Sequence, residues 1–341
     1  MWAKSGEPFG HGLLAHMLDV AAVAEAILCR ESTRTRDWAA STFGLHCDSA
    51  PRWLAAMCGL HDFGKAIPGF QAKWGAGQNA DEKAGFLFAP GAALRAQRHD
   101  LATSALLRAE FSARFSASSW IPAITGALGA HHGYFPRSPE IAAAKPLYEG
   151  SEWAKARAQL LDAYLAALQP CEPPTAEEVP LPAIAWLAGL VSVADWIGSN
   201  EEWFPLGERA ELISEHHARA GQLAERALDG IGWHGFRPLL AEDAEPDILV
   251  GRMLGRMAGS IMARPLQQAA DRLLASVSGP ALMIVEAPMG EGKTELAFLA
   301  HLRFQAANGH RGLYIALPTQ ATGNAMFDRT LAFLKSFSMD I

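Results

Sequence analysis

The stretch LAAMCGLHDFGKAIPGFQAKW, residues 54–74, places a His–Asp pair at the end of an apolar helical run. His61 and Asp62 close the run, and Lys65 follows three residues after the aspartate. A buried charge without a partner is costly, so this pair requires either a hydrogen-bond network or a metal ion. The rest of the sequence has to supply that partner.

The composition is that of an ordinary globular protein, and its net charge does not favour binding of nucleic acid over the whole surface. Of 341 residues, 50% are hydrophobic and 19% are charged, with a net charge of −7. Any contact with nucleic acid must therefore be local or depend on metal ions. The four cysteines are not spaced as CxxC, which argues against a zinc ribbon or a redox motif, and scattered thiols are typical of a reducing cytoplasm. They are Cys29, Cys47, Cys58 and Cys171.

No membrane segment is predicted. Charged residues and glycines interrupt the first twenty positions, so they do not form a secretory signal. The longest uncharged run, 179–194, is short for a membrane span and is followed by Asp195, which favours a buried helix.

Helical periodicity dominates the chain up to about residue 230. Helices are expected at 11–29, 51–61, 101–115, 120–133, 151–168 and 182–198. Loops rich in Gly, Pro and Gln are expected at 75–81 and 133–150, and no strand pattern precedes residue 248.

The pattern changes near residue 245. ALMIVEAP (281–288) and GLYIALP (312–318) read as strands, and KTELAFLAHLRFQAANG (293–309) between them reads as a helix closed by glycine. This β–loop–α–β alternation predicts a parallel α/β sheet.

Histidines and aspartates recur in five places, each in or beside an expected helix. They are His16, His61–Asp62, His99, His131–His132 and Asp195. A lone histidine on an apolar helix is usually a hydrogen-bonded core residue. The adjacent pair His131–His132 needs two separate partners, however, and with Asp195 it favours a metal site. Helices can bring such groups to one interior point, where two ions can promote phosphoester hydrolysis.

The order H…HD…H…HH…D resembles the HD superfamily of metal-dependent phosphohydrolases. More narrowly, it resembles the nuclease domain of the CRISPR-associated nuclease–helicases of type I systems. The segments that carry the resemblance are HMLDVAAVAE, GLHDFGKAIPGFQ, RHDLAT, GAHHG and SVADWIGS.

The resemblance implies two sets of ligands, one for each of two metal ions. His16, His61, Asp62 and Asp195 would hold one ion, and His99, His131 and His132 would hold the other, with Asp62 bridging. Lys65 would lie by the scissile phosphate, unless it is a surface lysine at a helix end. Ser199 would touch the phosphate, unless it only ends its helix.

The resemblance also implies hydrolysis of single-stranded DNA, with water attacking in line with the departing 3′ oxygen. Histidine-rich ligand sets suit Fe, Mn, Co or Ni better than Mg. Two alternatives stay open at this point. One is an HD phosphohydrolase that acts on nucleotides or cyclic dinucleotides. The other is a non-catalytic scaffold that metal ions stabilise and that only docks on Cascade, the crRNA-guided surveillance complex of type I CRISPR systems.

EAPMGEGKTE, residues 286–295, follows an expected strand and opens an expected helix, as a phosphate-binding loop does. Gly290 and Gly292 would let backbone N–H groups surround phosphate oxygens. Lys293 would reach the outer phosphates and Thr294 would ligate Mg²⁺ beside ATP. Ala287 stands where the usual pattern has glycine, a variant typical of superfamily 2 helicases.

Two neighbouring segments resemble further helicase motifs. RPLQQAADRLL would place Gln267 against adenine, unless it is an ordinary amphipathic helix start. ALPTQATGNAMFDR would contact the DNA backbone through Thr319, Gln320 and Thr322. The expected organisation is therefore a mainly α HD bundle with a helical linker over 1–245. The incomplete start of an α/β RecA-like helicase domain would follow over 246–341.

The expected partners follow from the resemblance. They are single-stranded DNA, the Cascade surveillance complex with its crRNA, and viral anti-CRISPR inhibitors, all in the cytoplasm and without a membrane. No Walker B box follows the second helicase motif. We therefore expect the chain as given to lack ATPase and unwinding activity.

Overall fold

The computed structural model describes most of the chain. The described residues are 1–7, 10–115, 118–146, 149–170, 172–207, 212–240, 243–257 and 260–337, without the side chains of 95 and 320–322. The chain divides into two compact units, one formed by 1–30 and 36–234 and the other by 31–35 and 235–341.

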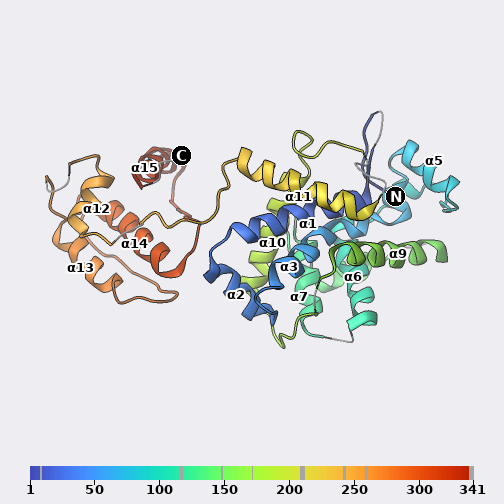
Figure 1. Cartoon of the computed structure of the whole chain (residues 1–341), viewed down its shortest axis with the longest axis horizontal. Helices are drawn as coiled ribbons and strands as arrows, with labels where there is room; N and C mark the ends of the chain where they lie inside the picture. The colour runs from blue at the N-terminus through green and yellow to red at the C-terminus, as the bar shows by residue number, and fades with distance from the viewer. Residues whose placement is uncertain are drawn as a thin grey trace. The chain divides into compact units, whose positions relative to one another are not determined.

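The first unit is mainly helical, as predicted (Figure 1). Its elements are β1 (Trp2–Lys4), β2 (His11–Gly12), α1 (Leu13–Arg30), α2 (Thr33–Phe43), α3 (Ala50–Gly59), the 3₁₀ helix η1 (Leu60–Lys65), α4 (Pro68–Gln71), α5 (Gly75–Lys83), the 3₁₀ helix η2 (Ala92–Arg95), α6 (His99–Phe115), α7 (Trp120–Gly129), α8 (Ser138–Ala143), α9 (Ser151–Leu168), α10 (Leu181–Gly198) and α11 (Ile213–Gly230). A few residues of α2 belong to the other unit.

Helix α1 forms the centre of this unit. Nearly every residue from Leu13 to Leu28 is buried, because α3, α10 and α11 pack around it. A helix that is apolar on all sides belongs in a core, so the run of alanines and aliphatic residues places α1 there. The polar His16 is therefore carried into the interior, where it is fully buried.

Helix α10 also packs inside the unit. By length and composition alone, Leu181–Gly198 could cross a membrane. It instead lies against α1 and α7, and Gly198 faces Val20 of α1. Its apolar face is therefore part of the protein core, as the sequence predicted.

The 3₁₀ helix η1 packs tightly against α6. A Cβ atom on Gly64 would lie 2.0 Å from the carbonyl oxygen of His99 and 2.4 Å from the amide nitrogen of Thr103. Only glycine permits this approach. Thr103 is buried, and its hydroxyl accepts a bond from the Gly64 N–H (2.8 Å) and donates to the His61 carbonyl (2.7 Å).

Several expectations about local structure are wrong. Strands do occur before residue 248, since β1 and β2 pair antiparallel. The expected loop at 75–81 is helix α5, because Gly77 packs directly on Trp2 and the buried Asp81 binds the amino terminus at 2.9 Å. The expected loop at 133–150 contains α8. Tertiary contacts here override a composition that is poor in helix formers.

Two expected helices end early. The helix expected at 51–61 stops at Gly59 and continues as η1. The helix expected at 120–133 stops at Gly129, so His131 and His132 lie in the turn that follows. Gly133 ends this turn with a φ of +83° and donates its N–H to the Ala130 carbonyl at 2.7 Å.

The second unit consists of α12 (Pro246–Met253), α13 (Pro265–Leu274), α14 (Lys293–Asn308) and α15 (Gln320–Phe337). The strands expected at 281–288 and 312–318 are wrong for the described structure, where both segments are unpaired and mostly exposed. Leu282 is 87% exposed and Tyr314 91%. An apolar segment becomes a parallel strand only beside partner strands, and neither segment has one among the described residues.

Candidate metal centre

Five elements of the first unit bring the predicted side chains together. His16 comes from α1, His61 and Asp62 from η1, His99 from the first residue of α6, His131 and His132 from the turn after α7, and Asp195 from α10. Residues that are far apart in sequence meet here because α1 packs on η1 and α10, and α6 packs on η1 and α7.

The side chains form two groups of possible metal ligands. Atoms of His16, His61 and Asp195 all lie within 4.8 Å of one another, and so do atoms of His99, His131 and His132. These are the two sets that the resemblance implied, apart from Asp62.

Asp62 lies between the two groups. One carboxylate oxygen, Oδ2, is 3.2 Å from His16 Nε2 and 3.4 Å from His61 Nε2. The other, Oδ1, is 3.4 Å from His99 Nε2 in the second group. A carboxylate that offers one oxygen to each side has the arrangement of a bridging ligand between two ions.

The histidine rings are oriented so that lone pairs face the centre. The backbone carbonyl of Cys58 lies 3.2 Å from His61 Nδ1, and that of Leu128 lies 2.7 Å from His131 Nδ1. Each Nδ1 therefore carries a proton, which leaves Nε2 as the ring atom that faces the centre, as in metal-ligating histidines. Both Nε2 atoms are buried, and neither has a hydrogen-bond partner among the described residues.

The contact between His99 and His132 also fits a role in metal binding. Their Nε2 atoms are 3.1 Å apart. Two imidazole nitrogens at this distance require either a proton between them or a cation that both lone pairs face. The donor chemistry of both groups therefore fits divalent metal ions.

The charges of the site favour a cation. Burial alone would lower the pKa of His61, but Asp62 and Asp195 outweigh it and raise the pKa to about 10. Burial would also raise the pKa of Asp62, but Lys65 and His61 hold it well below its usual range. Without an ion, His61 thus holds a proton between two carboxylates, and a bound ion would replace that proton.

Two histidines of the second group, His99 and His131, are neutral. Burial lowers the pKa of His99 to about 4 and that of His131 to about 3. Neutral imidazole is the form that binds metal, so these rings require no deprotonation at neutral pH.

Lys65 and Ser199 both contact the ligand carboxylates. Lys65 Nζ lies 2.5 Å from Asp62 Oδ2 and donates to the carbonyl of Ala3 at 3.2 Å. The Ser199 hydroxyl donates to Asp195 Oδ1 at 2.8 Å. Two further residues of the site were not predicted: Thr103, which fixes η1 to α6, and Lys4, whose ammonium donates to the Ser199 carbonyl at 2.8 Å. Neither residue has a signal in the sequence, because each acts through contacts formed only on folding.

The predicted phosphate loop lies in the second unit, where its residues mostly bond to one another. Gly290 and Gly292 have φ values of +83° and +77°, and Gly292 precedes α14. Lys293 opens α14, and its ammonium donates to the carbonyls of Ala287 (2.6 Å) and Pro288 (2.8 Å). The Thr294 hydroxyl accepts a bond from Arg329 at 3.4 Å.

Gln267 is buried beside this loop. Its side-chain amide donates to the Gly292 carbonyl at 3.1 Å, and its oxygen accepts the Arg264 N–H at 2.9 Å. Thr319 is exposed, and the side chains of Gln320 and Thr322 lie outside the described residues.

A helical bundle that places a His–Asp pair between two further histidine and aspartate groups defines a protein of the HD metal-binding class. The family described as "Cas3, HD domain" matches residues 2–204. The chain belongs to this Cas3 HD domain family.

Known relatives agree with this assignment. The chain is 39% identical, over 98% of its length, to a CRISPR-associated endonuclease/helicase Cas3 of Thermus thermophilus, but it spans only 35% of that relative. A crystal structure of the T. thermophilus Cas3 HD domain with Ni²⁺ has a TM-score of 0.55 at 35% identity, covering 68% of this chain and 89% of the other. T. fusca Cas3 with ATP has a TM-score of 0.75 at 26% identity, covering 98% and 37%.

Proposed function

We propose that the chain is a metal-dependent nuclease of type I CRISPR interference, which hydrolyses phosphodiester bonds in single-stranded DNA. The position of Asp62 between the two ligand groups carries the proposal. His16, His61, Asp62 and Asp195 would hold one ion. His99, His131 and His132 would hold the second, which Asp62 would share. The paired ions would supply an activated water and neutralise charge on the leaving oxygen.

The protein's own groups prepare this site. The carbonyls of Cys58 and Leu128 fix the tautomers of His61 and His131. Ser199 orients Asp195, and its proposed phosphate contact would require its hydroxyl to turn from that carboxylate. Lys65 lies close enough to Asp62 for its ammonium to offset negative charge on a phosphate bound there. Nickel, manganese, cobalt or iron would suit the histidine-rich ligands.

We propose that residues 246–341 begin a RecA-like helicase domain. Gly290, Gly292, Lys293 and Thr294 would bind ATP and Mg²⁺, with Gln267 supporting the loop. The support is a glycine-rich turn at the N-terminus of α14, where backbone N–H groups and the helix dipole favour phosphate. In the longer protein, this domain would translocate on DNA opened by Cascade and its crRNA. Viral inhibitors would act by blocking either step.

The test is cleavage of a single-stranded DNA oligonucleotide by the chain supplied with Ni²⁺, Mn²⁺, Co²⁺ or Fe²⁺, compared with Asp62→Ala and with Asp81→Ala. Asp81 is also a buried aspartate but binds the amino terminus. We expect cleavage by the wild type and Asp81→Ala and none by Asp62→Ala. Equal cleavage by all three, or hydrolysis of dNTPs or cyclic dinucleotides without cleavage of DNA, would refute the proposal.

A further inference from the structure

Three lysines, Lys4, Lys65 and Lys73, form a row that is linked by shared neighbours and begins at the first ligand group. Lys4 donates to the carbonyl of Ser199, whose hydroxyl binds Asp195. Lys65 donates to the carbonyl of Ala3, the neighbour of Lys4. The ring of Phe70 has Lys65 Nζ at 5.3 Å and Lys73 Nζ at 5.0 Å from its centroid.

The Phe70 ring, which Lys65 and Lys73 share, lies beside the second ligand group. The centroids of the Phe70 and His99 rings are 5.7 Å apart. Gln71 holds the row together, because its side-chain amide donates to the carbonyls of Trp2 and Lys65, both at 2.9 Å. Strand β1 and η1 are thereby fixed to each other, and the positions of Lys4 and Lys65 are fixed with them.

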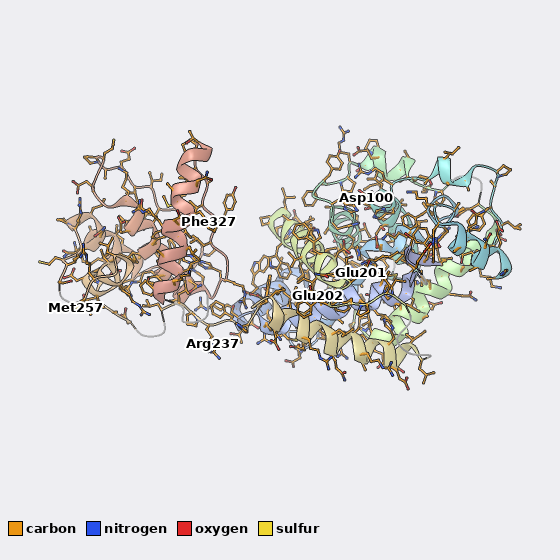
Figure 2. The ribbon with its side chains drawn as sticks, turned by 90° about the horizontal axis from the view of Figure 1, so that it is seen from above. Asp100, Glu201, Glu202, Arg237, Met257 and Phe327 are labelled. Atoms are coloured by element: carbon orange, nitrogen blue, oxygen red, sulfur yellow. The ribbon has the colours of Figure 1, made fainter. Side chains whose placement is uncertain are left out.

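Among the described residues, neither Lys4 nor Lys73 forms an ion pair, whereas Lys65 pairs with Asp62. Lys4 is only partly exposed, and the charged groups that act on it are Asp195, Lys65, Asp62 and Glu201 (Glu201 is labelled in Figure 2). Burial lowers the pKa of Lys4, while Asp195 opposes that shift. An ammonium held in this way retains N–H groups for an anion from outside.

We propose that Lys4, Lys65 and Lys73 form a phosphate track, which binds successive backbone phosphates of the single strand as it crosses the metal centre. Lys4 contacts the strand near Ser199 and Asp195, and Lys73 contacts it at Phe70, which packs against His99. The inference rests on the proposed function and adds two binding residues to it. In a chain of net charge −7, such a local row supplies the cations that a polyanion needs.

The experiment measures binding of a fluorescent single-stranded oligonucleotide by anisotropy, between about 50 and 200 mM salt, for the full 341-residue chain. Each lysine that contacts a phosphate contributes about 0.7 to the slope of log K against log salt concentration on single strands. We expect Lys4→Ala and Lys73→Ala each to reduce that slope by about this amount, and Lys4→Arg to preserve it. The control is Lys155→Ala, which removes an exposed charge from α9.

The outcomes separate this inference from the proposed function. If the wild type cleaves DNA but Lys4→Ala and Lys73→Ala keep its salt slope, the track is refuted and the nuclease stands. If the slopes change as expected but the wild type cleaves nothing, the track stands and the nuclease fails. A wild type that does not bind the strand refutes both.

Discussion

Thr103→Val tests whether the contact between η1 and α6 sets the metal centre. The Thr103 side chain is fully buried, and its hydroxyl bonds both the His61 carbonyl and the Gly64 N–H. Valine has nearly the same shape but can neither donate nor accept. Both groups of η1 would lose their partner on α6, at about 1–3 kcal/mol for each buried group left unpaired. We therefore expect the free energy of unfolding to fall by about 2–6 kcal/mol.

Metal affinity should fall as well. Segment η1 carries His61 and Asp62, while α6 carries His99, so a loosened contact alters the distance between Asp62 and the second group. Supporting residues of this kind typically contribute 10–100-fold to metal affinity, and we expect a loss of about that size. Unfolding is followed by circular dichroism in urea with a chelator present, and affinity is measured by calorimetric titration with Ni²⁺.

Thr125→Val is the matched control. Thr125 is equally buried, but its hydroxyl donates to the Ile121 carbonyl of its own helix at 2.8 Å and accepts from Arg108 at 3.1 Å. We expect a loss of about 1 kcal/mol in stability with unchanged metal affinity. If Thr103→Val binds metal as tightly as Thr125→Val, the contact between η1 and α6 does not set the centre.

Asp62→Asn should lower the number of bound metal ions per chain, measured by plasma mass spectrometry after dialysis, because a neutral amide cannot bridge two cations; Asp81→Asn should leave it unchanged, and equal losses would contradict the bridging role. Gly64→Ala should destabilise the chain by about 3 kcal/mol or more, since its Cβ would overlap the His99 carbonyl, and a melting temperature equal to that of wild type would disprove the close approach. In the metal-free protein, the lowered pKa values of His99 and His131 mean that unfolding takes up protons between about pH 6.5 and pH 4. The free energy of unfolding should fall as the pH falls through that window, by up to about 1.4 kcal/mol per pH unit for each histidine, and urea titrations showing no change there would exclude neutral buried rings.

The sequence alone was sufficient for the long helices with clear apolar periodicity. The spacing of apolar residues in 151–168 and 182–198 predicted α9 and α10 to within a residue, because helical periodicity is a local property. The same reasoning failed at 75–81, where packing against Trp2 forms a helix from a sequence of weak helix formers. It also failed at 281–288, because strand pairing depends on residues elsewhere in the chain.

The candidate site divides in the same way. The chemical types of its histidines and aspartates, and their order along the chain, are written in the sequence and point to a metal-binding protein. Only the tertiary structure places Asp62 between two ligand groups whose members are as distant in the sequence as His16 and Asp195. It also fixes η1 through Thr103 and brings Lys4 to the same centre. Distances between side chains on different helices depend on how those helices pack, and no local pattern of residues encodes that packing.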